Sequence, residues 1–281
     1  MTSLPAPAPV SHSDLLHAAR QDIDATDAVW LLMHVAGVSR TWLFTHGDAP
    51  AAPSLAKRYR GLVARRAAGE PVAYLTGRRG FWRFELEVTP ATLIPRAETE
   101  RLVELALERL PADRPLELAD LGTGSGAIAL ALATERPAAR VAATDASAEA
   151  LAVARRNAAS LGLSNVEFHA GDWCAALPAR AYDLIASNPP YIADRDPHLE
   201  EGDLRFEPAT ALASGPDGLA AIRQIAREAT AHLAPGGWLL VEHGWEQGAP
   251  VRAIFEGAGY VEVDTAVDLE QRDRVTLGRR T

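Results

Sequence analysis

The sequence predicts an α/β fold in which a seven-stranded sheet follows an N-terminal helical bundle and a β-hairpin. Three stretches with different apolar patterns predict it. Between residues 11 and 70 the apolar residues recur at helical spacing. Residues 81–88 alternate apolar and charged side chains, as a half-buried strand does. From about residue 97 short apolar runs alternate with helical stretches, which is typical of an α/β sheet.

The N-terminal region is predicted to form a small helical bundle. Gly69-Glu70-Pro71 fits a helix end, because glycine favours the position just past a helix and proline cannot continue one. We expect a helical domain over residues 1–71, with a flexible tail at residues 1–10. Its apolar positions are Leu15, Leu16 and Ala19; Val29, Leu32, Met33 and Val35; and Leu55, Tyr59, Leu62 and Val63.

A β-hairpin linker is predicted over residues 72–91. Its strand is the segment FWRFELEV at residues 81–88, and the sequence GRRG at residues 77–80 is expected to form the turn before it.

The remaining domain, residues 92–281, is predicted to contain the sheet. The last two of its seven strands have only a short connection, which departs from the six-stranded dinucleotide-binding fold. Strands are expected at 116–121, 140–144, 165–169, 182–187, 237–243, 260–265 and 274–278, and helices at 126–135, 147–161, 217–233 and 247–257.

Composition and charge narrow the function classes. The formal net charge of −9 argues against a surface that grips a phosphate backbone, so we expect no direct nucleic-acid partner. The single cysteine, Cys174, and a start without a signal-peptide pattern favour the cytoplasm. No apolar run reaches the roughly 20 residues of a membrane helix. The eight histidines show no metal-ligand spacing, so no metal site is expected.

A glycine-rich loop follows the first strand of the sheet. The segment DLGTGSG at residues 120–126 leads into a helix, and such a turn lets a ligand approach the backbone closely. Its pattern also satisfies the relaxed dinucleotide motif, and a tight turn without a ligand is the other alternative. The candidate binding residues in this loop are Asp120, Gly122, Thr123, Gly124, Ser125 and Gly126.

Acidic residues favour S-adenosylmethionine over a dinucleotide at this loop. The carboxylate of Asp120 would repel a pyrophosphate but favours a sulfonium and an ammonium group. Asp145 follows the second strand, where it suits the ribose hydroxyls; the alternative is an N-cap of the next helix. Asp172 and Trp173 follow the third strand and suit the adenine amino group and ring face, with core packing as the alternative for the indole.

The fourth strand runs into Asn188-Pro189-Pro190-Tyr191 beside the predicted loop. Prolines fix the backbone, so that the Asn188 side chain and a main-chain carbonyl can point to one site. Two carbonyl oxygens accepting both N–H bonds of a planar nitrogen would orient its lone pair towards a methyl donor. Tyr191 offers a flat face for stacking. All four residues are candidate substrate-binding residues. Asn188, Pro189 and Tyr191 are also catalytic candidates, and Asn188 is a candidate for contact with the cofactor. The alternative is a plain turn without a ligand.

Several blocks together resemble the PrmC (HemK) family of bacterial methyltransferases, which act on a glutamine N5 of peptide chain release factors. The resemblance implies a seven-stranded Rossmann-like class I methyltransferase sheet and the cofactor S-adenosylmethionine. It also implies methyl transfer to the glutamine of the Gly-Gly-Gln loop, which modulates translation termination. The blocks are LTGRRGFW (75–82), TLIPRAETE (92–100), DLGTGSGAIALALA (120–133), GDW (171–173), SNPPYI (187–192), DPHL…GDLRFEP (196–208), ALASGPDGL (211–219), LLVEHGWEQG (239–248) and RVTLGR (274–279).

The family's cofactor residues map onto residues 122–126, Asp145, Trp173 and Asn188, and its glutamine-binding residues map onto residues 188–191. Ala97 replaces a usual proline, which we expect to loosen the backbone of residues 94–100. The helical domain would dock the protein substrate, and we expect a monomer. Roles for Glu98, Glu100 and Glu242 are left open.

Two other functions fit the same motifs. The Asn-Pro-Pro-Tyr element also suits an adenine-N6 nucleic-acid methyltransferase, which would need a basic groove and a flipped base. The second alternative is a cofactor-binding module without turnover, against which the intact Asn188 and Tyr191 argue.

Overall fold

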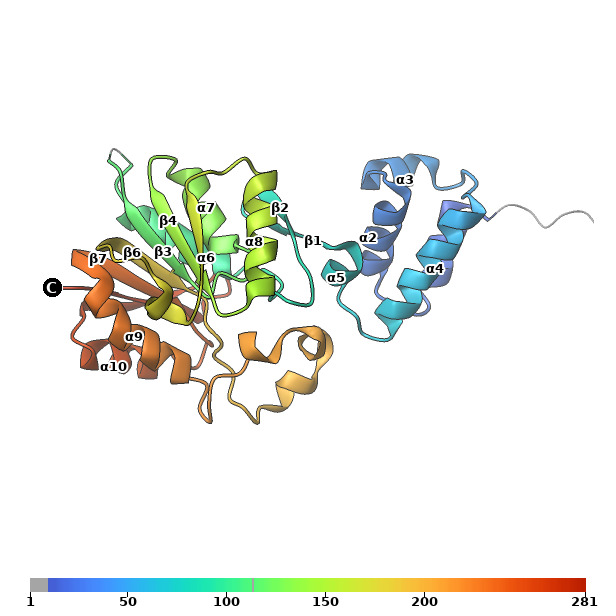
Figure 1. Cartoon of the computed structure of the whole chain (residues 1–281). Coiled ribbons are helices and arrows are strands. Elements are labelled where there is room, and N and C mark those ends of the chain that lie inside the picture. The colour runs from blue at the N-terminus through green and yellow to red at the C-terminus, as the bar shows by residue number, and fades with distance from the viewer. Residues whose placement is uncertain (1–9, 113) are drawn as a thin grey trace, which may run out of the picture. The chain divides into compact units, whose positions relative to one another are not determined.

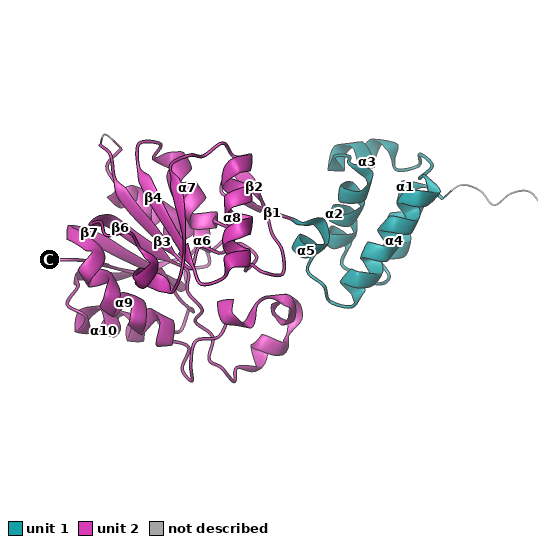
Figure 2. Cartoon of the chain, in the orientation of Figure 1, with its two compact units in different colours: residues 1–77 teal, residues 78–281 magenta. Residues whose placement is uncertain are grey.

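The computed structural model describes residues 10–112 and 114–281 (Figure 1). The tail predicted at residues 1–10 lies outside the described residues except for Val10. The chain forms two compact units, residues 1–77 and residues 78–281, drawn in teal and magenta in Figure 2. No helix among the described residues is long and apolar enough to cross a membrane.

The first unit is a helical bundle. Tyr59 is buried in its core, where its hydroxyl donates a hydrogen bond to the Ala28 carbonyl at 3.0 Å. Three helices begin at polar N-caps, Ser11, Asp24 and Ser39, whose side chains each accept a backbone N–H of the first turn. The helices are α1 (His12–Ala19), α2 (Ala25–Ala36), α3 (Arg40–His46), α4 (Pro53–Ala67) and α5 (Val72–Thr76).

The second unit opens with a hairpin whose turn differs from the prediction. Strands β1 (Arg78–Phe81) and β2 (Phe84–Glu87) pair antiparallel, so the turn lies at Trp82 and Arg83. The turn predicted at residues 77–80 was wrong, because residues 78–80 belong to β1. Trp82 makes the turn possible by adopting a positive φ of 56°. Its backbone N–H donates to Glu100 and its indole N–H donates to Glu135, both at 2.8 Å, so the hairpin is anchored on the second unit.

The seven-stranded sheet has the order β5-β4-β3-β6-β7-β9-β8. Its neighbours from β5 to β7 pair parallel, and β9 runs antiparallel to both β7 and β8. The strands are β3 (Glu117–Leu121), β4 (Arg140–Asp145), β5 (Val166–Ala170), β6 (Tyr182–Ser187), β7 (Leu233–Glu242), β8 (Val261–Val267) and β9 (Asp273–Arg279). All seven predicted strands are present, which confirms the predicted α/β class.

Helices cover both faces of the sheet (Figure 1). Alternate residues of each strand point to opposite faces, so Leu118 packs in one core with α6 and α7, and Ala119 packs in the other with α9 and α10. Helix α6 is not among the predicted helices, although its buried Leu102 and Leu105 follow a helical period. The helices are α6 (Thr99–Arg109), α7 (Ala127–Glu135), α8 (Ala148–Ser160), α9 (Ala220–His232) and α10 (Gly248–Gly257).

Candidate active site

A cavity of about 510 Å³ opens at the carboxyl ends of β3, β4 and β6. The central strand β3 pairs with β4 on one side and with β6 on the other, so Leu121 lies between Thr144 and Ser187. The direction of winding reverses between β3 and β6, and parallel sheets bind ligands at this kind of point. The size of the cavity is within the range of small-molecule sites, which is roughly 300–1,000 Å³.

The glycine loop lines one side of this cavity. Residues 122–125 all line it, whereas Gly126 is the N-cap of α7 and lies outside the lining. The N–H groups of Gly122 and Thr123 both donate to the Thr144 carbonyl at 2.9 Å, which ties the loop to the end of β4. Gly122 has a φ of +71°, and a Cβ on it would lie 2.9 Å from the Trp173 ring. A larger residue would therefore strain the backbone and displace the indole.

Asp120 lies behind the loop and not in the cavity lining. Its fully buried carboxylate accepts hydrogen bonds from the Thr123 hydroxyl at 2.7 Å and the Ala129 N–H at 3.1 Å. Burial raises the pKa of Asp120 to about 7, against the lowering effect of these hydrogen bonds. Asp120 therefore braces the loop and the start of α7, a position that the sequence motif did not distinguish from direct contact.

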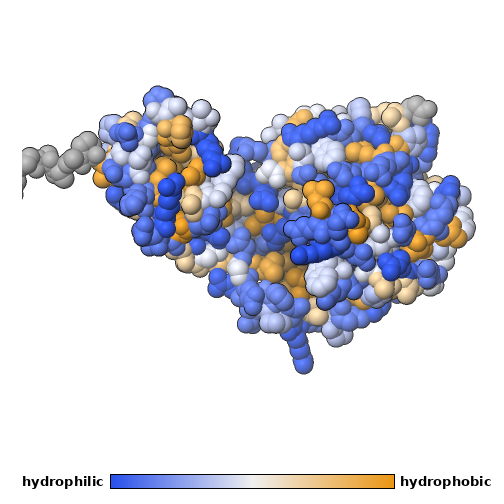
Figure 3. All heavy atoms as spheres, turned by 180° about the vertical axis from the view of Figure 1, so that it is seen from behind, coloured by the Kyte–Doolittle hydropathy of each residue, from blue (hydrophilic) through white to orange (hydrophobic). Residues whose placement is uncertain are grey.

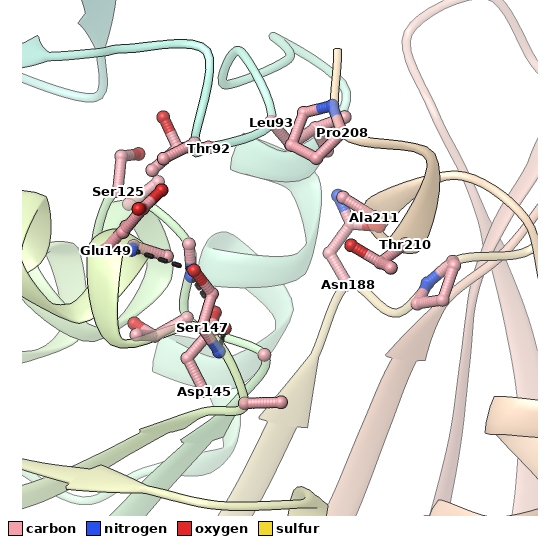
Figure 4. Close-up of a pocket in the computed structure, with 18 of the residues that line it drawn as sticks. Thr92, Leu93, Ser125, Asp145, Ser147, Glu149, Asn188, Pro208, Thr210 and Ala211 are labelled. Atoms are coloured by element: carbon pink, nitrogen blue, oxygen red, sulfur yellow. Dashed lines mark hydrogen bonds between the residues drawn. The ribbon is translucent and has the colours of Figure 1, made fainter.

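Asp145 lies in the cavity lining with its carboxylate held at both oxygens (Figure 4). One oxygen accepts the Gly124 N–H and the other accepts the Ser147 N–H, each at 2.8 Å. The N-cap of α8 is Ser147 and not Asp145, so the alternative role considered for Asp145 was wrong. Burial raises the pKa of Asp145. Glu149, on the first turn of α8, lines the same side of the cavity and was missed by the sequence analysis.

Asp172 and Trp173 line the cavity next to the loop. Trp173 has a positive φ of 39°, which is unusual for a bulky residue, and its indole packs over Gly122. The ring also contacts one of the two apolar cores, so the packing role and the lining role occur together. Gln224 donates a hydrogen bond to Asp172 at 3.4 Å.

The Asn-Pro-Pro-Tyr element supplies the opposite side. Asn188 and Pro190 line the cavity, whereas Pro189 and Tyr191 do not. In Figure 4 Asn188 lies across the cavity from Asp145. Tyr191 turns its hydroxyl to Glu242, at 3.4 Å, and burial raises its pKa. The structure therefore does not bring the Tyr191 ring to the position of the predicted stacking face.

Two further segments, within residues 90–96 and 208–211, also contribute to the lining, as does Thr99, and none of them was predicted as part of the site. Buried Glu207 joins them, because its carboxylate accepts the Ile94 N–H at 3.0 Å and pairs with Arg96. The Pro95 carbonyl accepts a hydrogen bond from Arg79 at 3.2 Å. These contacts fix the backbone immediately before Ala97. The block resemblance over residues 92–100 and 196–208 was the one sequence signal for these segments.

The charges of the lining fit a cationic ligand better than a pyrophosphate. Asp145, Glu149 and Asp172 line the cavity, and the one arginine of the lining, Arg96, is paired with Glu207. Carboxylates attract the sulfonium and ammonium groups of S-adenosylmethionine and repel phosphates. The three carboxylates, the glycine loop that lets a ligand approach the backbone, and the size of the cavity together fit this cofactor.

Comparisons with known proteins agree with this site. A family model described as the PrmC N-terminal domain matches residues 11–77, and one described as the methyltransferase small domain matches residues 97–210. The release factor glutamine methyltransferase of Xylella fastidiosa strain Temecula1 is 58% identical, with 97% of this chain and 98% of that protein covered. The protein of the same name from Escherichia coli strain K12 is 48% identical, with 90% and 91% covered.

A solved methyltransferase from Pyrococcus furiosus has the same fold, with a TM-score of 0.54 at 19% identity over 77% of this chain and 96% of that one. The similarity to the curated proteins spans both units of the chain and contains the cavity-lining segments. This chain belongs to the family of release factor glutamine methyltransferases.

Proposed function

We propose that this protein transfers the methyl group of S-adenosylmethionine to the side-chain amide nitrogen, N5, of the glutamine in the Gly-Gly-Gln loop of bacterial release factors. Such a transfer modulates translation termination. The observation that carries the proposal is the placement of Asn188 across the cavity from Asp145, within a chain that matches release factor glutamine methyltransferases over nearly its whole length.

The β3–β4 side of the cavity suits the cofactor. S-adenosylmethionine, when bound, supplies an electrophilic methyl group on a sulfonium sulfur. Asp145 and Glu149 would accept the ribose hydroxyls, because both carboxylates line the cavity at the end of β4 and the start of α8. The Trp173 indole would pack against the adenine ring and Asp172 would accept its amino group. Residues 122–125 would bring the backbone close to the amino acid portion.

The β6 side suits the acceptor amide. An amide nitrogen is a poor nucleophile because its lone pair is delocalised into the carbonyl. The Asn188 Oδ1 atom and a main-chain carbonyl of the Asn-Pro-Pro-Tyr element would each accept one of its N–H bonds, which turns the lone pair towards the methyl group. Pro190 lines the cavity beside them and would contact the flat amide. For Tyr191 we propose support of this turn, since Gln247 binds its carbonyl and Glu242 binds its hydroxyl.

The reaction needs no strong general base. The amide nitrogen becomes acidic as it is alkylated, so its proton can pass to water after the transfer. Asn188 therefore acts by orientation and by stabilising the positive charge that develops on the nitrogen, and S-adenosylhomocysteine leaves.

We propose that the N-terminal unit docks the release factor. Its family model covers residues 11–77, and two aromatic side chains stand out to solvent on it, Trp30 on α2 (54% exposed) and Phe44 on α3 (90% exposed). Apolar residues, orange in Figure 3, reach the surface of this unit among hydrophilic ones. Exposed aromatic residues often carry much of the binding free energy at protein interfaces.

Mass spectrometry of release factor after incubation with enzyme and cofactor tests the function. One added methyl group on the loop glutamine is expected. A methyl group on lysine, or on adenine in DNA or RNA offered in parallel, would refute it.

Trp30→Ala and Phe44→Ala test the docking role. Both should raise KM for intact release factor, while a short Gly-Gly-Gln peptide should react as with the unchanged enzyme. Since release factors work at the ribosome, we place the enzyme in the cytoplasm. We expect a monomer by light scattering.

A further inference from the structure

The amide of Asn188 is held from outside the Asn-Pro-Pro-Tyr element. Its Nδ2 atom donates a hydrogen bond to the Thr99 hydroxyl oxygen at 3.1 Å. Thr99 is the first residue of α6, lies 89 positions away in the sequence, and is buried at the cavity wall. Because Nδ2 is committed to Thr99, the Oδ1 atom of the same planar amide is the oxygen left for a ligand.

A buried carboxylate stands behind Thr99. Glu242 is the last residue of β7, its side chain is buried, and it is outside the cavity lining. Thr99 lies close enough to this carboxylate to lower the pKa of Glu242, though less than burial raises it, and their contact falls outside normal hydrogen-bond geometry. The Tyr191 hydroxyl also donates to this carboxylate, at 3.4 Å, and among the described residues the Oε2 atom has no hydrogen-bond partner within normal geometry. The proposed function gives Thr99 no part, and gives Glu242 only its contact with the Tyr191 hydroxyl.

The direction in which each group donates its proton follows from the chemistry of the groups. An ionised carboxylate only accepts hydrogen bonds, and a hydroxyl has one proton to donate. With Glu242 ionised, the Thr99 proton goes to the carboxylate, and the Thr99 oxygen can then only accept from Asn188. The amide of Asn188 is left with one orientation, in which its carbonyl oxygen is available to the cavity.

We propose that Thr99 and Glu242 are positioning residues that keep the Asn188 carbonyl oxygen turned towards the substrate amide. The proposal rests on the proposed function, in which that oxygen accepts an N–H of the reacting glutamine. It adds two residues, from α6 and β7, to a site that the sequence motif places in four consecutive residues.

A neutral group at position 242 would lose this control. A protonated carboxyl or a carboxamide can donate to the Thr99 oxygen, and Thr99 can then donate to the Asn188 Oδ1 atom. Asn188 would then turn its NH₂ group to the cavity, where it cannot accept an N–H. Burial raises the pKa of Glu242 to about 7, Arg274 on β9 opposes this, and Glu98, before α6, adds to it. The rate of methyl transfer should therefore fall as the pH drops below about 7.

An isosteric pair at position 99 tests the first half of the proposal. Thr99→Val keeps the volume and removes the hydroxyl, whereas Thr99→Ser keeps the hydroxyl. At saturating cofactor, Thr99→Val should lower the single-turnover rate on release factor roughly 10- to 100-fold, and Thr99→Ser by less than about threefold. Both variants should bind S-adenosylmethionine with a Kd within about twofold of the wild type by calorimetry. In an Asn188→Ala background Thr99→Val should cost nothing further, because it acts through Asn188.

Glu242→Gln tests the second half. In the wild type, the plot of methyl-transfer rate against pH should show an acid limb, in which the rate falls below about pH 7. The rate of Glu242→Gln should equal the low rate of the wild type at acid pH and should not change with pH. A Thr99→Val enzyme as fast as the wild type, or a Glu242→Gln enzyme that keeps the acid limb, would overturn the inference. These results are distinct from failure of the proposed function, in which the wild-type enzyme itself would place no methyl group on the glutamine.

Discussion

The β3–β4 side of the cavity and its β6 side are built from different kinds of contact. On the β3–β4 side, Asp145 is fixed by two backbone N–H groups, that of Ser147, 2 positions away, and that of Gly124, 21 positions away. On the β6 side, Asn188 is fixed by a side chain 89 positions away. The first side is preformed for binding, whereas the second depends on the orientation of one amide. Variants on the two sides should therefore affect different kinetic constants.

The largest effect is expected for Asn188→Ala. It removes the acceptor for the reacting nitrogen, and loss of one such oriented group costs roughly 100- to 1,000-fold in rate. The Kd for S-adenosylmethionine should change by less than about threefold, because the β3–β4 side is intact. Single-turnover assays and calorimetry on a variant shown to be folded by circular dichroism measure both. A near-normal rate would remove Asn188 from the chemistry.

The second prediction concerns the buried carboxylate that braces the β3–β4 side. The pKa of Asp120 is about 7 in the folded protein, against an ordinary value of 3.8. Between these two values the folded protein keeps a proton that the unfolded chain has lost, so the contribution of Asp120 to stability falls as the pH rises through this interval. The loss is on the order of 2–4 kcal/mol once the pH exceeds 7.

Asp120→Asn isolates this effect, because the carboxamide oxygen can still accept the Thr123 and Ala129 hydrogen bonds. Urea unfolding without cofactor should show the variant gaining stability relative to the wild type between pH 5 and pH 8, by on the order of 2–4 kcal/mol. The buried Glu242 titrates in both proteins and cancels in the difference. A difference that does not change with pH would mean that Asp120 is ionised throughout.

Asp145→Ala should mainly weaken binding. Charge-assisted hydrogen bonds are worth roughly 1.5–3 kcal/mol each, so loss of one ribose contact raises the Kd for S-adenosylmethionine about 10- to 100-fold. The rate at saturating cofactor should fall much less, in contrast to Asn188→Ala. Asp145→Asn is the matched control, since it retains an oxygen for one of the two backbone N–H groups that the carboxylate holds. Unchanged affinity in Asp145→Ala would place the ribose elsewhere.

The same contrast explains how much of the site could be predicted from sequence. The loop at residues 122–126 directly follows β3 and Asp145 is the last residue of β4, so strand prediction alone brings them to one edge of the sheet. Thr99, which accepts the Asn188 hydrogen bond, lies on α6, and Glu242, behind Thr99, lies on β7, and local periodicity carries no signal for such a pairing. Tyr191 shows the limit, because its aromatic ring suggested stacking, but a buried carboxylate far along the chain binds its hydroxyl.

The smallest effect is expected for a pair of glycine substitutions within the loop. Gly122 and Gly124 both have positive φ, +71° and +57°, so alanine at either position carries a similar backbone cost of about 1 kcal/mol. They differ in their surroundings: a Cβ at Gly122 would lie 2.9 Å from the Trp173 ring, whereas a Cβ at Gly124 would meet no atom within 4 Å. Gly122→Ala should therefore also displace the indole proposed to pack on adenine and weaken cofactor binding roughly threefold to tenfold beyond Gly124→Ala. Calorimetric Kd values and quenching of Trp173 fluorescence by bound cofactor measure the difference between the two variants. In a Trp173→Ala background the two Kd values should become equal. Equal affinities for the two alanine variants would show that the β3–β4 side holds the cofactor by its backbone and carboxylates alone, without the indole.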